Sequence, residues 1–416
     1  MPGLDLGRRG FLGAAGSMLW MLSASRAWAD ADWDVPPEIR PVSSVVPDDL
    51  RRGDHYTLDP DVRTAGFMNR YAMNSDFGPF VAPSDARLRR LVREVAAIAQ
   101  LRAMQQSDVF GKAALDAGRS VVRSARNLID DPAATLSAIP EGIGSIFGRV
   151  TEQARRSGRS QHEDGPARQI LAVSSFKREY AARLGVDAYS SNQVLQDALD
   201  RVAWASAAGN LTLGALSFAT GALALQVASN VRMLDQARSI VEATPPSELS
   251  RRNRLELQRM QVPVGVADRF LQNPSLSPRH MTVIVASMMA LGSIPGRAQF
   301  IAYASRADTE ESALVFQQMA ELIAGFSTQV LPVRHIAIMA NLPVAFTETG
   351  SVVLLPIDRL LWTERSAGLA QSLAGAQPAA PGIWLTGTAS PRAVAGLAKI
   401  GLALTPRCGE RLPLLD

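Results

Sequence analysis

Residues 336–357 read IAIMANLPVAFTETGSVVLLPI, and this stretch decides the fold of the last part of the chain. Two apolar runs, 336–347 and 351–357, lie on either side of Glu348-Thr349-Gly350. Apolar, β-prone runs that flank a short glycine-containing turn are typical of a β-hairpin. The sequence therefore predicts a hairpin here.

The segments after this hairpin alternate between helical and strand patterns. A helix is expected at 360–373, a strand at 383–386, a helix from Ser390-Pro391 to Gly401, and a strand at 402–404. A strand, a helix and a strand in so short a space favour a right-handed crossover between parallel strands. Residues 328–416 are thus predicted to form a small α/β domain.

The segments before the hairpin are mostly helical in pattern. Apolar residues recur at helical spacing within 167–184 and at Leu195, Leu199 and Val202, and a capping box of Asp308 and Glu311 is expected before a last helix. The later helices are expected at 247–261, 277–291, 295–306 and 309–326. Because the connections are short, residues 169–327 are predicted to form a domain of stacked antiparallel helices.

The N-terminal third has a weaker pattern. Ser84 is expected to cap a helix whose apolar face carries Leu88, Leu91, Val95 and Ile98. The remaining predictions are an extended lead at 30–61, a β-hairpin plus helices at 62–156 and a linker at 157–168. The predicted class is α+β, mainly helical, with stacked antiparallel helices, a short N-terminal β-hairpin and a small C-terminal α/β unit.

Residues 1–29 have the pattern of an export signal. Arg8-Arg9-Gly10-Phe11-Leu12 opens a weakly apolar stretch, and the small-residue pattern Ala27-Trp28-Ala29 precedes Asp30. The segment resembles a bacterial twin-arginine signal peptide. The resemblance implies cleavage near Ala29/Asp30, a periplasmic or secreted protein, and passage across the membrane in a folded state.

Charge and cysteine content limit the partners and the stabilising chemistry. The whole chain carries a formal net charge of +4, of which the signal accounts for +2 through Arg8, Arg9, Arg26 and Asp5. The field of the rest is weak, and nucleic acid is not an expected partner. Cys408 is the only cysteine, so no disulfide can form within the chain.

One short motif carries a catalytic alternative. Ser174-Ser175-Phe176-Lys177 is similar to the S-x-x-K motif of serine acyl-transferases that act on cell-wall peptides. The nearest matches to that family's two other elements are Ser190-Ser191-Asn192 and Leu385-Thr386-Gly387, where Leu385 replaces a basic residue. The resemblance implies Ser174 as nucleophile and Lys177 as base. The other interpretation is a half-exposed serine and lysine on one helix face.

Two further segments suggest membrane contact. Residues 202–231, which lie between Arg201 and Arg232, contain no charged residue. A stretch of this length can cross a bilayer, although a buried helix of a bundle explains it as well. The glycines at 142, 144 and 148 favour a tight turn into a helix, and the alternative is a helix on a membrane surface with Ile143, Ile146, Phe147 and Val150 toward lipid. The histidines are scattered at 55, 162, 280 and 335, so neither a metal nor a cofactor is expected.

These patterns favour one function over two alternatives. We expect an exported cell-envelope protein of non-catalytic binding or scaffold type, whose partner is an unknown protein or envelope component. The alternatives are a serine hydrolase or acyl-transferase acting through Ser174 and Lys177, and a membrane-active protein that inserts residues 202–231.

Overall fold

The computed structural model describes residues 33–106, 110, 166–207, 232–376, 380–412 and 414–415. The predictions for the export signal, for the surface helix at 143–150, for most of the linker and for residues 208–231 lie outside these ranges. Among the described helices, none combines the length and the apolar character needed to cross a membrane.

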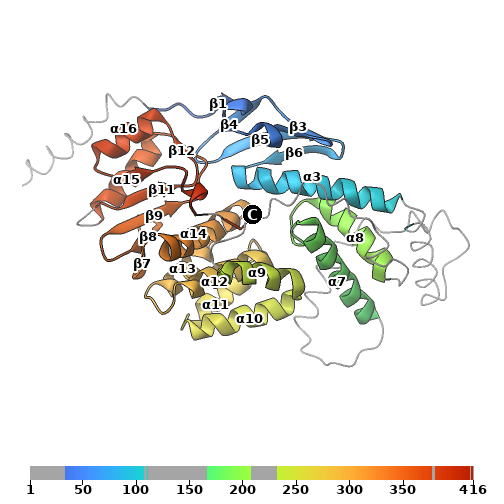
Figure 1. Cartoon of the computed structure of the whole chain (residues 1–416). Coiled ribbons are helices and arrows are strands. Elements are labelled where there is room, and N and C mark those ends of the chain that lie inside the picture. Colours follow the sequence, from blue (N-terminus) through green and yellow to red (C-terminus); the bar gives the residue numbers. More distant parts are fainter. Residues whose placement is uncertain are drawn as a thin grey trace, which may run out of the picture.

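The N-terminal segment forms a six-stranded antiparallel sheet (Figure 1). The sheet follows the order β1-β4-β5-β3-β2, and β6 pairs with β5. Its strands are β1 (Glu38–Pro41), β2 (Arg52–Gly53), β3 (Tyr56–Leu58), β4 (Asp61–Thr64), β5 (Asn69–Ser75) and β6 (Gly78–Ala82), with η1 (Val42–Ser44) and α2 (Asp48–Arg51) between them. The predictions of an extended lead and of a short hairpin are therefore wrong, although β5 and β6 do pair around the predicted turn.

The helix α3 (Asp85–Gln105) connects this sheet to the helical part of the chain. Ser84 caps it as predicted, because its Oγ accepts the backbone N–H of Arg87 at 3.1 Å. Leu88, Leu91 and Val95 pack under the sheet. The later turns of α3 pack against α7 (Pro166–Leu184) and α8 (Gln193–Ala207), which lie on the far side of α3 in Figure 1.

The remaining helices form the body of the molecule. They are α9 (Arg232–Ala243), α10 (Pro246–Arg259), α11 (Val264–Leu271), α12 (Pro278–Ala290), α13 (Arg297–Ala304) and α14 (Glu310–Gln329). The predicted capping box of α14 is displaced by one residue, because Thr309 and Ser312 form it instead of Asp308 and Glu311. Apolar side chains of α12 and α14 share one core with Ile336, Ala345 and Val352 of the C-terminal sheet.

The C-terminal sheet has five strands in the order β13-β11-β9-β8-β7. The strands are β7 (His335–Met339), β8 (Leu342–Phe346), β9 (Ser351–Leu355), β11 (Gly382–Leu385) and β13 (Leu404–Thr405). The predicted pairing around Glu348-Thr349-Gly350 is present between β8 and β9, and β11 and β13 are parallel as predicted. The run 336–347 is not one strand, because Ala340 and Asn341 adopt positive φ values of 46° and 62° and reverse the chain.

Two helices and a small parallel ladder complete this part. The helices α15 (Glu364–Gly375) and α16 (Pro391–Lys399) pack on the sheet, and η3 (Cys408–Glu410) follows the last strand. The short strands β10 (Arg359–Leu360) and β12 (Thr388–Ala389) pair in parallel.

The fold class is α+β with two multi-stranded sheets, one from each end of the chain. The description as mainly helical with only an N-terminal hairpin is wrong. Strands of two to four residues that mix proline, acidic and apolar side chains carry too little alternation to be recognised from sequence. The proposed domain boundaries stay a prediction.

Candidate functional site

The polar face of α3 is buried in the centre of the molecule. Arg90 and Glu94 are 7% and 3% exposed, although they lie off the apolar face of Leu88, Leu91, Val95 and Ile98. Oε1 of Glu94 accepts hydrogen bonds from Arg87 Nη1 at 2.8 Å and from Ser190 Oγ at 2.6 Å. Its Oε2 accepts one from Asn192 Nδ2 at 2.9 Å. Glu94 therefore fixes the 185–192 loop, which connects α7 and α8, to α3.

The same polar centre continues to α12 and α14. His280 is 2% exposed, and its Nδ1 accepts the backbone N–H of Ser277 at 3.2 Å in a capping box at the start of α12. Burial, together with the nearby positive charges of Arg90 and Arg279, lowers the pKa of His280 to about 3. The imidazole is therefore neutral, and its Nδ1 acts as an acceptor.

Glu321 of α14 is the second buried acid of this centre. Its Oε1 accepts a hydrogen bond from Gln317 Nε2 at 2.6 Å, and its Oε2 accepts the backbone N–H of Leu415 at 2.7 Å. Burial raises the pKa of Glu321 to about 7, against the lowering effect of those two hydrogen bonds. The C-terminal segment at Leu415 is thus held to α14 by a carboxyl group that titrates near neutral pH.

A pocket of about 30 Å³ opens beside this centre, between α7, the 185–192 loop, α9 and α12. Its polar walls include Arg178, Tyr189, Asp187 and Arg279. Arg178 is 9% exposed, and its Nε has no hydrogen-bond partner within the described ranges. The same is true of the Tyr189 hydroxyl, which is also buried. We call this site the Arg178–Tyr189 pocket.

The other polar groups of the pocket are held in place by the chain itself. Oδ1 of Asp187 accepts the backbone N–H of Tyr189 at 2.9 Å, while its Oδ2 lies 3.8 Å from Arg279 Nη1. Arg279 Nη2 donates to the Leu415 carbonyl at 3.2 Å. These contacts fix the loop that carries Tyr189 and the position of the Arg279 side chain.

The chemistry of the pocket is that of a hydrogen-bond donor site. Burial raises the pKa of Tyr189 to about 12, while the nearby Arg178 lowers it, so the hydroxyl stays protonated and can donate. An arginine Nε–H also donates and cannot accept. Two buried donors without a partner carry an unfavourable desolvation energy, which a bound acceptor would offset.

The residues of the catalytic alternative are placed on one face of α7. Ser174 is half-buried, and Nζ of Lys177 lies 2.6 Å from Asp200 Oδ1 on α8 in an ion pair of low exposure. Asn192 caps α8 through Oδ1, which accepts the N–H groups of Val194 and Leu195 at 3.1 and 3.3 Å. Lys177 and Asn192 therefore both have structural roles, because they hold α7, α8 and α3 together.

The third element of that resemblance lies in a different part of the fold. Leu385 ends β11 within the C-terminal core, and Thr386 Oγ1 donates to the Ile357 carbonyl at 3.0 Å. Ser174, by contrast, belongs to α7, which packs with α3 and α8. The third element therefore belongs to a different packing cluster from the first two, which both lie in the cluster of α3, α7 and α8.

The histidines and the cysteine have separate surroundings. His55 Nδ1 lies 2.9 Å from Asp76 Oδ2 at the surface, and His335 stacks on Phe346. Cys408 is buried at 1% exposure, and burial raises the pKa of its thiol to about 12. His162 lies outside the described ranges. Among the residues that the structure describes, no group of three His, Cys, Asp or Glu side chains could hold a metal ion.

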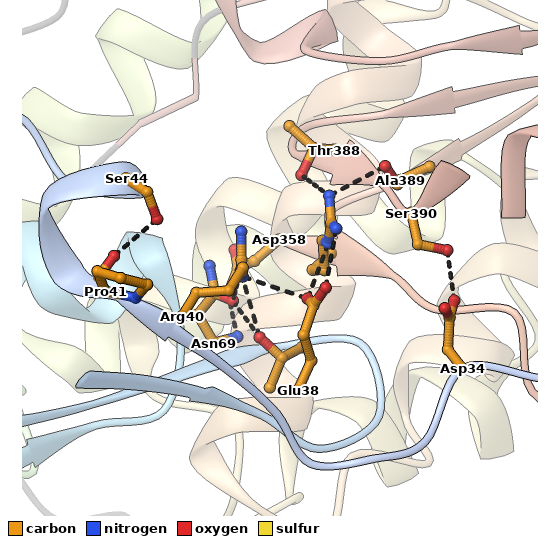
Figure 2. A network of polar contacts seen from close by, with 12 residues as sticks. Asp34, Glu38, Arg40, Pro41, Ser44, Asn69, Asp358, Thr388, Ala389 and Ser390 are labelled. Atoms are coloured by element: carbon orange, nitrogen blue, oxygen red, sulfur yellow. Dashed lines mark hydrogen bonds and ion pairs between the residues drawn. The ribbon is translucent and has the colours of Figure 1, made fainter. Parts of the chain in front are cut away.

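A second polar network joins the N-terminal sheet to the C-terminal part (Figure 2). Arg359 makes a bidentate ion pair with Glu38, with Nε–Oε2 and Nη2–Oε1 distances of 3.0 and 2.9 Å. Oδ2 of Asp358 accepts the backbone N–H groups of Asn69 and Asp85. Asp34, shown at the other end of Figure 2, accepts a hydrogen bond from Ser390. This network joins the N-terminal sheet to the β10–β12 ladder and to the start of α16, and its groups are engaged with one another.

Sequence reasoning missed the Arg178–Tyr189 pocket. Arg178, Tyr189 and Arg279 come from three separate elements, so no spacing in the sequence connects them. A partial signal was available in α3, where Arg87, Arg90 and Glu94 recur on one helix face with mixed charge. That pattern is typical of a face that pairs with another polar surface as well as of a solvated face.

The comparisons with known proteins give no relative. No family model, no curated protein and no solved structure matches the chain.

Proposed function

We propose that this chain is an exported cell-envelope protein that binds a ligand at the Arg178–Tyr189 pocket and does not catalyse a reaction on it. One observation carries the proposal: Arg178 and Tyr189 both line one pocket, and the buried donors Arg178 Nε and Tyr189 Oη have no hydrogen-bond partner among the residues that the structure describes. Leaving such groups unpaired costs about 1–3 kcal/mol each, so a bound group that accepts hydrogen bonds from them would stabilise the folded chain.

The export part of the proposal rests on residues 1–29. The Arg8-Arg9 pair and the Ala27-Trp28-Ala29 pattern support a periplasmic or secreted location. Replacing the pair with two lysines (R8K and R9K) should leave the protein in the cytoplasm with the leader uncut, whereas Arg26→Lys should be exported. Export of both variants to the same extent would contradict the twin-arginine route.

The binding part is tested by retention of small molecules. The purified chain is incubated with a low-molecular-weight extract of the envelope of the producing organism, separated by gel filtration and analysed by mass spectrometry. Ala182 lines the pocket, so Ala182→Trp should fill it and abolish retention of the ligand. Glu179→Gln on the exposed side of the same helix should retain the ligand. Absence of any compound that depends on an open pocket would contradict the function.

The two alternative functions, a serine hydrolase and a membrane-active protein, make different testable predictions. A hydrolase acting through Ser174 predicts that Ser174→Ala loses labelling by a serine-reactive acyl probe. A membrane-active protein predicts that the purified chain floats with liposomes at low salt. The ion pair between Lys177 and Asp200 does not support the hydrolase, because it gives Lys177 a structural role between α7 and α8.

A further inference from the structure

We propose that the Arg178–Tyr189 pocket recognises the single carboxylate at the end of a ligand. This inference rests on the proposed function and assigns the chemical class of the group that enters the pocket. Four observations carry it: the kind of free groups, their burial, the size of the pocket and the charge of its walls.

Two of the residues that line the pocket carry a buried donor without a partner in the described part of the chain. Arg178 Nε–H and Tyr189 Oη–H need an acceptor, and the pKa of Tyr189 keeps its hydroxyl protonated at physiological pH. A carboxylate accepts through both of its oxygens and is the planar partner that an arginine side chain binds best. An ammonium or an amide N–H group could not satisfy either donor.

The burial of these donors makes the interaction strong. Arg178 is 9% exposed, and the Tyr189 hydroxyl has almost no contact with solvent. A charge-assisted hydrogen bond in such an environment is weakly screened by water and salt. The site is also preorganised, because Tyr189 is held by Asp187 and the 185–192 loop is held by Glu94. Little conformational freedom is lost on binding.

The size of the pocket limits what can enter. A volume of about 30 Å³ has room for a group of a few atoms. A planar carboxylate fits this space, while the remainder of the ligand must extend outward from the pocket.

The charges of the walls favour a monoanion over a dianion. Arg178 and Arg279 are balanced by Asp187 and Glu242. Because the walls carry no net charge, the second negative charge of a phosphate dianion would have no cation to offset it, and a tetrahedral phosphate needs more room than a planar carboxylate. One negative charge placed directly against Arg178, away from Asp187, is the best match.

The experiment measures binding of defined carboxylates to the purified chain by isothermal titration calorimetry. The probes are acetate, N-acetyl-alanine and N-acetyl-alanyl-alanine, with N-acetyl-alanyl-alanine amide as the matched neutral compound. We expect the carboxylates to bind and the amide to bind at least tenfold more weakly. Acetate binding as tightly as the dipeptide identifies a small free acid as the ligand, and stronger binding of the dipeptide identifies a peptide C-terminus.

Two variants link this binding to the two donors. Arg178→Gln should weaken carboxylate binding at least tenfold, and Tyr189→Phe should weaken it about fivefold. Because the Tyr189 hydroxyl has no hydrogen-bond partner within the described ranges, Tyr189→Phe should fold with unchanged or higher stability, so its weaker binding cannot come from misfolding. Arg183→Gln, on the exposed side of α7, should bind normally.

The outcomes separate the inference from the function. Retention of an envelope compound in a pocket-dependent manner without binding of any carboxylate would overturn the carboxylate assignment and leave the binding function in place. Carboxylate binding that is unaffected by Arg178→Gln and Tyr189→Phe would overturn the assignment of the site. Phosphate binding tighter than every carboxylate would overturn the charge argument.

Discussion

Asp358 Oδ2 accepts the backbone N–H of Asp85 at 3.0 Å, which joins two residues 273 positions apart in the sequence. The same oxygen accepts the N–H of Asn69 at 2.9 Å. Burial and the nearby charge of Asp85 raise the pKa of Asp358 well above its usual value. One buried carboxyl group thus connects the start of α3 and the N-terminal sheet to the C-terminal part of the fold.

This relationship predicts a contrast between two substitutions of Asp358. Asp358→Ala removes the acceptor of two buried N–H groups and should cost about 2–5 kcal/mol of stability. Asp358→Asn keeps an oxygen for both N–H groups and removes the repulsion with Asp85, so at pH 7 it should be as stable as the wild type or more stable. Chemical denaturation at pH 7 measures both, and equal losses in the two variants would contradict the role of the oxygen.

The raised pKa of Glu321 predicts an unusual pH dependence. Because the folded-state pKa of about 7 lies above the unfolded value of 4.5, the folded protein binds the proton more tightly. The contribution of Glu321 to the free energy of unfolding is fully present below pH 4.5. It is lost as the pH rises to 7, and the loss amounts to about 3 kcal/mol. Glu321→Gln should remove this dependence and gain stability relative to wild type as the pH rises from 4.5 to 7.

The geometry around Glu321 makes the glutamine variant a fair test. Gln317 has an Oε1 without a partner among the described residues, so its amide can turn to accept from a glutamine at position 321. The oxygen of that glutamine can still accept the Leu415 N–H. Denaturation curves at several pH values measure the difference, and a constant difference between pH 4.5 and 7 would refute the assigned pKa.

His280 predicts a pH dependence of the opposite sign. Its folded-state pKa of about 3 lies below the unfolded value of 6.5, so the unfolded state binds the proton more tightly. Stability is therefore lost as the pH falls below 6.5, by about 1.4 kcal/mol per pH unit. His280→Asn keeps an acceptor for the Ser277 N–H and has no proton to gain.

The His280→Asn variant should thus lose less stability than wild type between pH 6.5 and 4. Glu321→Gln, measured in parallel, is the matched comparison, because its advantage grows with rising pH and that of His280→Asn with falling pH. If the stability of both variants relative to wild type changed in the same direction with pH, the pKa values assigned to His280 and Glu321 would be contradicted.

Glycine positions test the packing of the C-terminal part. A Cβ at Gly396 of α16 would lie 2.2 Å from a ring carbon of the buried Trp362. Gly396→Ala should therefore cost about 1–3 kcal/mol through overpacking. The control is Gly265→Ala on α11, where a Cβ meets no atom within 4 Å and alanine should stabilise the helix by up to about 1 kcal/mol. Thermal unfolding compares the Gly396→Ala and Gly265→Ala variants. Similar melting temperatures would contradict the close packing of α16 against Trp362.

The local features that the sequence predicts correctly are those set by neighbouring residues. The cap at Ser84 and the turn at Glu348-Thr349-Gly350 depend on a few adjacent side chains and on glycine. The turn at Ala340-Asn341 was missed, because its positive φ values occur without glycine. The surrounding apolar residues then looked like one uninterrupted strand.

The features that depend on tertiary contacts could not be predicted. The burial of Glu94 results from the docking of the 185–192 loop against α3, and Arg90 lies near His280 of α12. The candidate site also depends on tertiary contacts. Arg178 and Tyr189 are recognisable as candidate binding residues only because they line the same pocket and have buried donors without a partner in the described part of the chain. Sequence motifs pointed instead to Ser174 and Lys177, which lie on the same helix as Arg178.

The most direct measurement of the central claim is the NMR signal of the Arg178 Nε–H group in the purified chain. On saturation with a ligand that carries a carboxylate, the account predicts that this proton resonance moves downfield and exchanges more slowly with water, because it gains a charged acceptor. An Arg178 Nε–H signal that stays unchanged while the ligand binds would contradict the account.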